Sequence, residues 1–252
     1  MNRRAGQRPL VVGHRGSAGT APENTMAAFR IAADAGADMV EFDVRMTADG
    51  HFVVHHDRSL GRTSDGRGRI HELTLTEVQS VDAGGWFAQR FRGERIPTLR
   101  QVLEELPPRM GVNIEVKTDG HRRRSRAAAD ALLATLRAAR RTDGIVVSSF
   151  DQGFLRRFRR RSPDVPIGAL YLPIRDGLRP ASSVARRVGG SVFICSRAQL
   201  RRRHVRDAHA HGVAVAVYGV NTIAELRHMI EAGVDAVITD FPERIVRALR
   251  SA

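Results

Sequence analysis

Residues 213–239 read VAVAVYGVNTIAELRHMIEAGVDAVIT and contain one complete repeat of an alternating pattern. An apolar strand is expected at 213–218, a helix at 222–232 and a second apolar strand at 235–239. Short apolar runs on both sides of a helix are typical of parallel strands that are buried on both faces. This stretch therefore predicts a strand–helix–strand unit of an α/β protein.

The same alternation continues on both sides of this stretch. We expect further strands at 9–13, 38–45, 111–116, 144–148, 166–170 and 191–195, with helices at 26–35, 99–107, 122–141, 151–161, 181–188, 198–211 and 242–250. Eight strand–helix units in 252 residues match the roughly 250 residues of a TIM barrel. We therefore predict a single TIM (β/α)8-barrel domain over residues 1–252. A doubly wound open sheet is the alternative, although no G-x-G-x-x-G motif follows the first strand.

The connection after the second strand is longer than the others. Ala48-Asp49-Gly50 predicts a hairpin turn, after which the chain returns through 51–55 to His56. Residues 58–97 are rich in glycine and contain the only tryptophan, so we expect a small insertion lying over one end of the barrel. Earlier in the chain, either Asn24 or Thr25 can cap the helix that begins at Met26.

Composition excludes several classes of protein. A single cysteine, Cys195, excludes an internal disulfide framework and a cysteine-rich zinc site. The apolar run Leu10-Val11-Val12 is too short for a signal peptide, and no run approaches the roughly 18 apolar residues of a membrane span. We therefore expect a soluble, cytoplasmic protein.

Charge is distributed unevenly along the chain. Residues 1–120 hold equal numbers of acidic and basic side chains, so residues 121–252 carry the whole net charge of +14. A basic half could attract nucleic acid or an anionic membrane surface. Few aromatic residues lie among the arginines, whereas a single-strand binder would require them throughout, so we expect no nucleic-acid partner. The charge is compatible with transient contact with an anionic membrane surface.

Three carboxylates lie at alternating positions in two neighbouring predicted strands. Glu41 and Asp43 have i, i+2 spacing in one strand, and Glu115 lies late in the next barrel strand. Residues at this spacing share a face, and the C-terminal strand ends of a TIM barrel meet at one rim. Three carboxylates there suit Ca²⁺ or Mg²⁺. Taken alone, Glu41 and Asp43 also fit the exposed face of a half-buried strand.

Histidines and cations fall at the same rim. His14 and Arg15 end the first strand, and the hairpin returns His56 to that end. Arg15 offers a bidentate fork for phosphate, and Lys117, the only lysine in the chain, offers a point charge. Two histidines can serve as general acid and base, although the sequence does not assign which is which.

Several motifs together resemble the glycerophosphodiester phosphodiesterase family. They are His14-Arg15-Gly16, Pro22-Glu23-Asn24-Thr25, Glu41-Phe42-Asp43, His56-Asp57, Leu60-Gly61-Arg62-Thr63, Trp86-Phe87, Ile96-Pro97-Thr98-Leu99, Asn113-Ile114-Glu115-Val116-Lys117 and Ile238-Thr239-Asp240-Phe241-Pro242. The resemblance implies a TIM barrel with an insertion after the second strand. It also implies metal-dependent hydrolysis of glycerophosphodiesters to glycerol 3-phosphate and an alcohol, in lipid and glycerol metabolism.

The resemblance also assigns roles to residues. It implies that Glu41, Asp43 and Glu115 bind the metal, that His14 and His56 are the catalytic acid/base pair, and that Arg15 and Lys117 contact the phosphate. The family's usual tryptophan near the end of the seventh strand is replaced by Tyr218, which leaves the shape of the alcohol pocket open.

Two alternative functions remain at this stage. The same site could release the headgroup of lysophospholipids, as a lysophospholipase D does. The other is an arginine-rich nucleic-acid-binding protein, which would have no need for three carboxylates around one pocket. The alcohol headgroup, the choice between Ca²⁺ and Mg²⁺ and the oligomeric state stay open.

Overall fold

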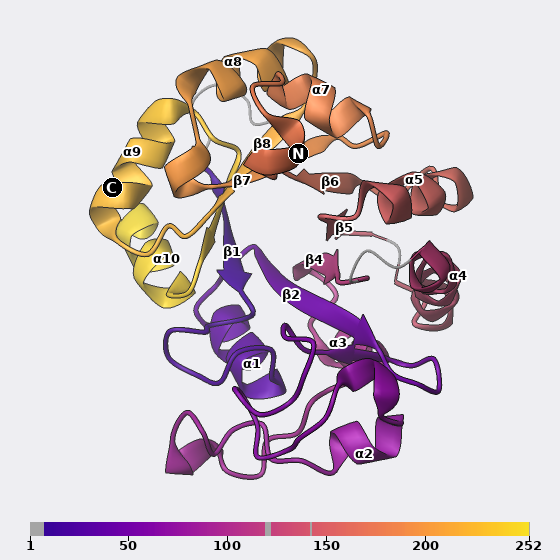
Figure 1. The fold of residues 1–252 in the computed structure, drawn as a ribbon. Helices are drawn as coiled ribbons and strands as arrows, with labels where there is room; N and C mark the ends of the chain where they lie inside the picture. The colour runs from indigo at the N-terminus through magenta and orange to yellow at the C-terminus, as the bar shows by residue number, and fades with distance from the viewer. Residues whose placement is uncertain (1–7, 119–121, 142, 252) are drawn as a thin grey trace.

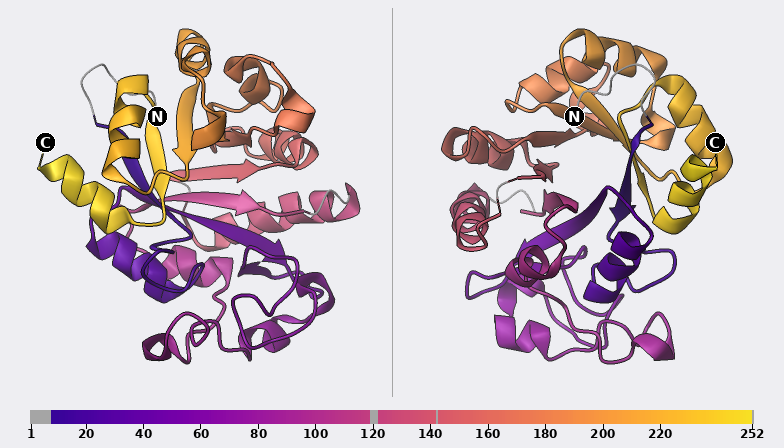
Figure 2. Two further views of the ribbon diagram at one scale, coloured as in Figure 1. Left: turned by 60° about the vertical axis from the view of Figure 1, so that its left-hand side comes forward. Right: turned by 180° about the vertical axis from the view of Figure 1, so that it is seen from behind.

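The chain folds into a closed barrel of eight parallel strands surrounded by helices (Figures 1 and 2). The computed structural model describes residues 8–118, 122–141 and 143–251. The barrel strands are β1 (Leu10–His14), β2 (Met39–Met46), β4 (Gly111–Val116), β5 (Ile145–Ser149), β6 (Ile167–Leu170), β7 (Val192–Ser196), β8 (Ala214–Tyr218) and β9 (Ala236–Thr239). β1 pairs in parallel with both β2 and β9, and these pairings close the ring. The TIM-barrel prediction is confirmed, and an open sheet is excluded.

Helices cover the outside of the ring. They are α1 (Met26–Asp34), α2 (Leu75–Gln79), α3 (Leu99–Glu105), α4 (Arg122–Ala138), α5 (Gln152–Arg161), α6 (Pro173–Asp176), α7 (Ala181–Arg186), α8 (Arg202–Ala210), α9 (Ile223–Ala232) and α10 (Pro242–Arg250). Three short 3₁₀ helices are also described, η1 (Ile70–Glu72), η2 (Gln89–Phe91) and η3 (Arg197–Gln199). None of the described helices is long and apolar enough to cross a membrane.

Successive side chains along the barrel strands point alternately outward and inward, and they form two separate apolar clusters. One face of β2 contributes Val40, Phe42 and Val44 to the large core beneath the helices. Met39, on the other face, joins a smaller cluster that contains Val12, Val146, Leu170, Val192, Ile194, Ala214, Ala216, Ala236 and Ile238. Residues at i, i+2 spacing share a face, so Glu41 and Asp43 lie on the same face of β2 as Met39. The barrel interior is therefore acidic at the C-terminal end of β2 and apolar over much of its remaining surface.

The long connection after β2 begins with a hairpin. β3 (Phe52–Val54) pairs antiparallel with β2, and Gly50 takes the positive φ of 84° that the turn requires. Between β3 and α3 lie η1, α2 and η2, together with a separate apolar cluster formed by Val53, Leu60, Ile70, Val78, Ala83 and Ile96. The predicted turn is confirmed, and the insertion has a small core of its own.

Most element ends lie within one residue of the predicted ranges, but α3, α4 and α7 end two or three residues earlier than predicted, and two rim connections differ in their helices. Thr25, and not Asn24, caps α1, because the Thr25 side chain accepts a hydrogen bond from Ala28 N. The helix expected at 198–211 is split into η3 and α8, and a short helix, α6, precedes α7. Both differences fall where the chain leaves the C-terminal end of a strand, so periodicity alone did not reveal them.

Candidate active site

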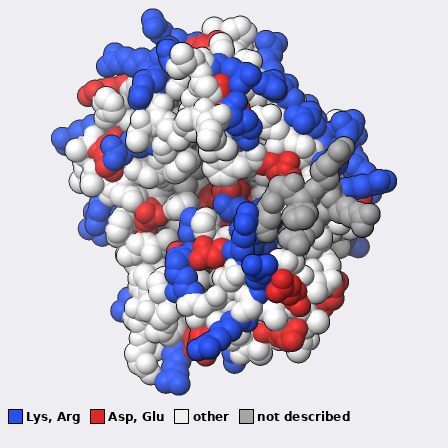
Figure 3. All heavy atoms as spheres, in the orientation of Figure 1, with Lys and Arg blue, Asp and Glu red and all other residues white. Residues whose placement is uncertain are grey.

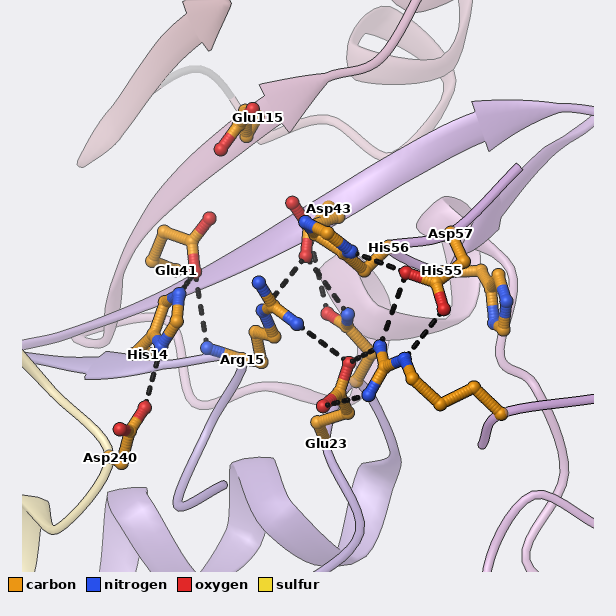
Figure 4. Close-up of polar contacts among 12 residues, drawn as sticks. His14, Arg15, Glu23, Glu41, Asp43, His55, His56, Asp57, Glu115 and Asp240 are labelled. Atoms are coloured by element: carbon orange, nitrogen blue, oxygen red, sulfur yellow. Dashed lines mark hydrogen bonds and ion pairs between the residues drawn. The ribbon is translucent and has the colours of Figure 1, made fainter. Parts of the chain in front are cut away.

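Three buried carboxylates form the centre of the candidate site (Figure 4). Glu41 and Asp43 come from β2 and Glu115 comes from β4, and one oxygen of each lies within 4.8 Å of the others. Parallel pairing places Asp43 directly beside Glu115 and His14 directly beside Glu41. The strand register therefore brings together residues that are far apart in the sequence.

The carboxylates differ in their electrostatic surroundings. Burial and the charge of Asp43 raise the pKa of Glu41 to about 7. Burial also raises the pKa of Glu115, against the opposing charge of Lys117. Burial acts on Asp43 in the same direction, but Lys117 and Arg15 outweigh it and hold the pKa of Asp43 below its ordinary value. Lys117 contacts both neighbours, with its Nζ 3.0 Å from Asp43 Oδ1 and hydrogen-bonded to Glu115.

Unusual backbone conformations position the β1–α1 loop against these acids. Arg15 and Asn24 have φ angles of 51° and 61°, in the left-handed region that side-chain-bearing residues rarely adopt. The Arg15 N–H donates to Glu41 at 3.1 Å, and its side chain donates to Glu23 at 2.7 Å. Asn24 exchanges two hydrogen bonds with Asp43, one through its amide and one from the Asp43 N–H. Strain of this kind is typical of functional sites.

His14 is held by a carboxylate from the last barrel strand. Its Nδ1 lies 2.6 Å from Asp240 Oδ1, and Asn221 donates to the other Asp240 oxygen at 2.7 Å. The opposite ring atom, Nε2, lies 4.0 Å from Glu41. Burial lowers the pKa of His14, but the hydrogen bond to Asp240 and the charge of Glu41 outweigh it and leave the pKa above its ordinary value.

His56 has an equivalent carboxylate partner. Its Nδ1 lies 2.7 Å from Asp57, which accepts a 2.6 Å hydrogen bond from Arg62. Arg62 also binds both carboxylate oxygens of Glu23, the partner of Arg15. Burial and the nearby positive charge of Arg15 lower the pKa of His56, in spite of the charge of Asp43. Arg62 thus links the surroundings of His56 to those of Arg15.

A cavity of about 200 Å³ joins these groups. One part of its wall is polar and comes from β1 to β4 and the loops that follow them, with His14, Arg15, Glu41, His56, Asn113, Glu115 and Lys117. The remaining wall is mainly apolar and comes from the ends of β5 to β9, with Ser148, Phe150, Leu170, Ile194, Tyr218 and Ile238. Tyr218 therefore lies on the apolar wall. The sequence alone did not predict how this residue shapes the pocket.

The structure brings all seven predicted site residues into one place. Six of them line the cavity, and Asp43 lies just beneath it with an exposed fraction of 1%. His55 lies apart from this group, with its ring nitrogen 3.2 Å from the Ser59 carbonyl. Sequence reasoning did not single out the supporting residues Asp57, Arg62 and Asp240, although all three lie within quoted motifs.

The donor set fits a hard divalent cation. The three carboxylates supply only oxygen, which Ca²⁺ and Mg²⁺ prefer. Burial raises the pKa of Glu41 and of Glu115, so a nearby cation would favour their charged forms. In addition, Asn113 Oδ1 is buried without a hydrogen-bond partner among the described residues, and Arg15 Nε is buried with only a 3.3 Å ion pair to Asp43. A cation and a phosphate oxygen would satisfy these groups.

Fold and site together define a barrel enzyme. An acidic cluster, two histidine–carboxylate pairs and the positively charged side chains of Arg15 and Lys117 surround one cavity. The model of the glycerophosphoryl diester phosphodiesterase family matches residues 14–244. The chain belongs to this family, and the predictions of the family and of a phosphoric diester hydrolase are confirmed.

Proteins with similar sequences and structures support membership of this family. A glycerophosphodiester phosphodiesterase of Caldanaerobacter subterraneus is 34% identical over 247 residues, which cover 96% of this chain and 98% of that protein. A structure described as a glycerophosphoryl diester phosphodiesterase from Silicibacter pomeroyi aligns with a TM-score of 0.89 at 28% identity, covering 99% of this chain and 95% of the other. An Oleispira antarctica phosphodiesterase in complex with the product sn-glycerol-3-phosphate aligns with a TM-score of 0.88 at 30% identity, covering 96% and 97%.

Proposed function

We propose that this chain hydrolyses glycerophosphodiesters to sn-glycerol 3-phosphate and an alcohol. The observation that carries the proposal is a single cavity lined by two histidines, each held at Nδ1 by a carboxylate, beside the acidic cluster. The Oleispira relative, which contains sn-glycerol-3-phosphate, supports the product. Water supplies the hydroxyl that the phosphate gains and the proton that the leaving alcohol gains.

Glu41, Asp43 and Glu115 would hold the divalent cation, Ca²⁺ or Mg²⁺. A cation bound there supplies positive charge to the non-bridging phosphate oxygens and so favours nucleophilic attack at phosphorus. Lys117 already contacts Asp43 and Glu115, so it stands beside the cluster as a second positive charge. Its place on the cavity wall allows it to stabilise the charge that the phosphate gains in the transition state.

Arg15 binds the phosphate from the other side. Its main-chain N–H and one guanidinium nitrogen are fixed by Glu41 and Glu23, while Nε lies 3.3 Å from Asp43 Oδ2 as an ion pair without a hydrogen bond. That arrangement fixes the guanidinium on the cavity wall, where it can donate to a phosphate oxygen.

His14 and His56 carry out the proton transfers. The carboxylate at each Nδ1 fixes the ring orientation and leaves Nε2 as the atom that exchanges a proton. One histidine removes the proton of the nucleophile, either water or the glycerol 2-hydroxyl, and the other protonates the leaving alkoxide.

Substitution and chelation test this function. His14→Ala and His56→Ala should each lower kcat on glycerophosphocholine by roughly 10²–10⁴-fold, the usual contribution of a general acid or base. EDTA should abolish release of sn-glycerol 3-phosphate, and Ca²⁺ or Mg²⁺ should restore it. Turnover close to wild type in both histidine variants, or after exhaustive chelation, would disprove these assignments.

A second substrate class is favoured by the apolar wall of the cavity. Phe150, Leu170 and Ile238 offer no partner to a polar headgroup, but they fit an alkyl chain. The same residues could then release the headgroup from a lysophospholipid. Comparing kcat/KM for lysophosphatidylcholine and glycerophosphocholine distinguishes the two substrates.

A further inference from the structure

The most exposed large apolar side chains of the described residues lie at the rim of the active site. Ile174 is 92% exposed and Leu178 is 83% exposed, whereas most large apolar side chains of the barrel are buried. Both lie in the connection from β6 to α7, on α6 and in the turn after it. This connection leaves the C-terminal end of a barrel strand, so it lies at the same end as the acidic cluster.

This segment is held firmly by buried polar contacts. Asp176 is 1% exposed and accepts hydrogen bonds from Leu172 N at 2.9 Å and from Arg175 at 2.6 Å. Arg175 also donates to the main-chain carbonyls of Phe150 and Leu170, two residues that line the catalytic cavity. These contacts fix the conformation of the segment against the cavity wall, and in this conformation Ile174 and Leu178 are exposed.

The surroundings of this turn are strongly basic. Asp176 is the only acidic residue between Ile167 and Arg203, a stretch that contains eight arginines. Arg179 follows Leu178 and is exposed, and its hydrogen bonds go to main-chain carbonyls. Figure 3 shows many basic side chains around the upper part of the molecule, where Figure 1 places the second half of the chain.

We propose that Ile174 and Leu178 insert into an anionic lipid surface and dock the active-site rim on it. Two apolar side chains among arginines match an interfacial anchor, in which apolar insertion and attraction to anionic headgroups act together. A protein partner would need a larger contact, because specific interfaces bury about 800 Å² on each side. This inference goes beyond the proposed function and does not depend on it, since lipid binding is measured without turnover.

Co-sedimentation with vesicles tests the proposal directly. The wild-type protein should bind vesicles of phosphatidylcholine containing phosphatidylglycerol far better than phosphatidylcholine alone. Ile174→Ser and Leu178→Ser should each weaken that binding about tenfold, the lower limit for burying one large aliphatic side chain. Arg179→Gln should weaken it about fivefold, as expected for one basic residue near an anionic membrane.

Matched controls separate this proposal from a folding defect and from the proposed function. Arg109→Gln removes an exposed arginine at the opposite end of the barrel, before β4, and should bind vesicles as wild type does. The Ile174→Ser/Leu178→Ser variant should retain the wild-type Tm and hydrolysis of soluble glycerophosphocholine. Failure of the wild type to bind anionic vesicles, or unchanged binding by the double variant, would refute the docking site. Loss of self-association in the double variant, with no vesicle binding by the wild type, would instead identify an interface between protein chains.

Discussion

Replacing Arg62 with methionine should impair catalysis far more than stability. The Arg62 guanidinium binds Asp57, which orients His56, and Glu23, which orients Arg15. Methionine retains much of the apolar stem and removes all of these hydrogen bonds. We expect the two proposed catalytic regions to lose their common support while the barrel stays folded.

The expected loss of stability and the expected loss of kcat follow from different properties of the same contacts. The Arg62 side chain is 47% exposed, so solvent screens its ion pairs and the expected loss of stability is at most about 1 kcal/mol. In the proposed mechanism catalysis depends on the position of His56, and a hydrogen bond to a charged group contributes about 1.5–3 kcal/mol to holding such a position. If that loss appears in the transition state, kcat falls by roughly 10–100-fold.

Steady-state kinetics and thermal unfolding measure these two effects separately. Arg69→Met is the matched control, because Arg69 lies in the same insertion and its 3.7 Å ion pair with Glu72 is exposed. Arg62→Lys should give an intermediate kcat, since an ammonium group cannot bridge two carboxylates as a planar guanidinium does. The Asp57→Asn and Arg62→Met effects should also be non-additive, because both act through His56. A kcat for Arg62→Met within about twofold of the Arg69→Met value would refute this reasoning.

Two further predictions concern pH. Without metal, the raised pKa of Glu41, about 7, means that its contribution to stability is lost as the pH rises from the ordinary carboxyl value toward 7. Because a divalent cation would replace the proton that Glu41 otherwise retains, Ca²⁺ or Mg²⁺ should raise Tm more at about pH 8 than at about pH 5; equal shifts would contradict the assignment. Asp240→Asn removes a carboxylate that raises the pKa of His14, so the limb of the pH–rate profile that reports His14 should move to lower pH. An unshifted profile, with kcat reduced, would show that Asp240 acts only structurally.

Apolar periodicity was sufficient to predict the barrel because each strand is short and bounded by turn residues. The prediction of a strand at 111–116 agrees with β4, and the Asp49-Gly50 hairpin has the expected positive φ at Gly50. Periodicity was insufficient for α6, since this helix has only four residues and exposes Ile174. Its formation depends on the buried contacts of Asp176, which join parts of the chain that the apolar pattern does not relate.

The central residues of the site were predictable, but their supporting partners were not. Glu41 and Asp43 share a face of one strand, so two-residue spacing was enough to place them together. Asp240 contacts His14 across 226 positions of sequence, and only closure of the barrel brings those positions together. Spacing along one strand carries no information about a contact between the first and last strands.

Barrel closure therefore has a chemical consequence as well as a structural one. β1 lies between β2 and β9, so His14 has the acidic cluster on one side and Asp240 on the other. Both neighbours raise the pKa of His14, but only Glu41 belongs to the proposed metal site. A cation bound to the cluster would decrease the contribution of Glu41 to this pKa, whereas the hydrogen bond to Asp240 would retain its effect. We therefore expect the contact with Asp240, beyond the last barrel strand, to hold the His14 ring whether or not the neighbouring strand binds a metal.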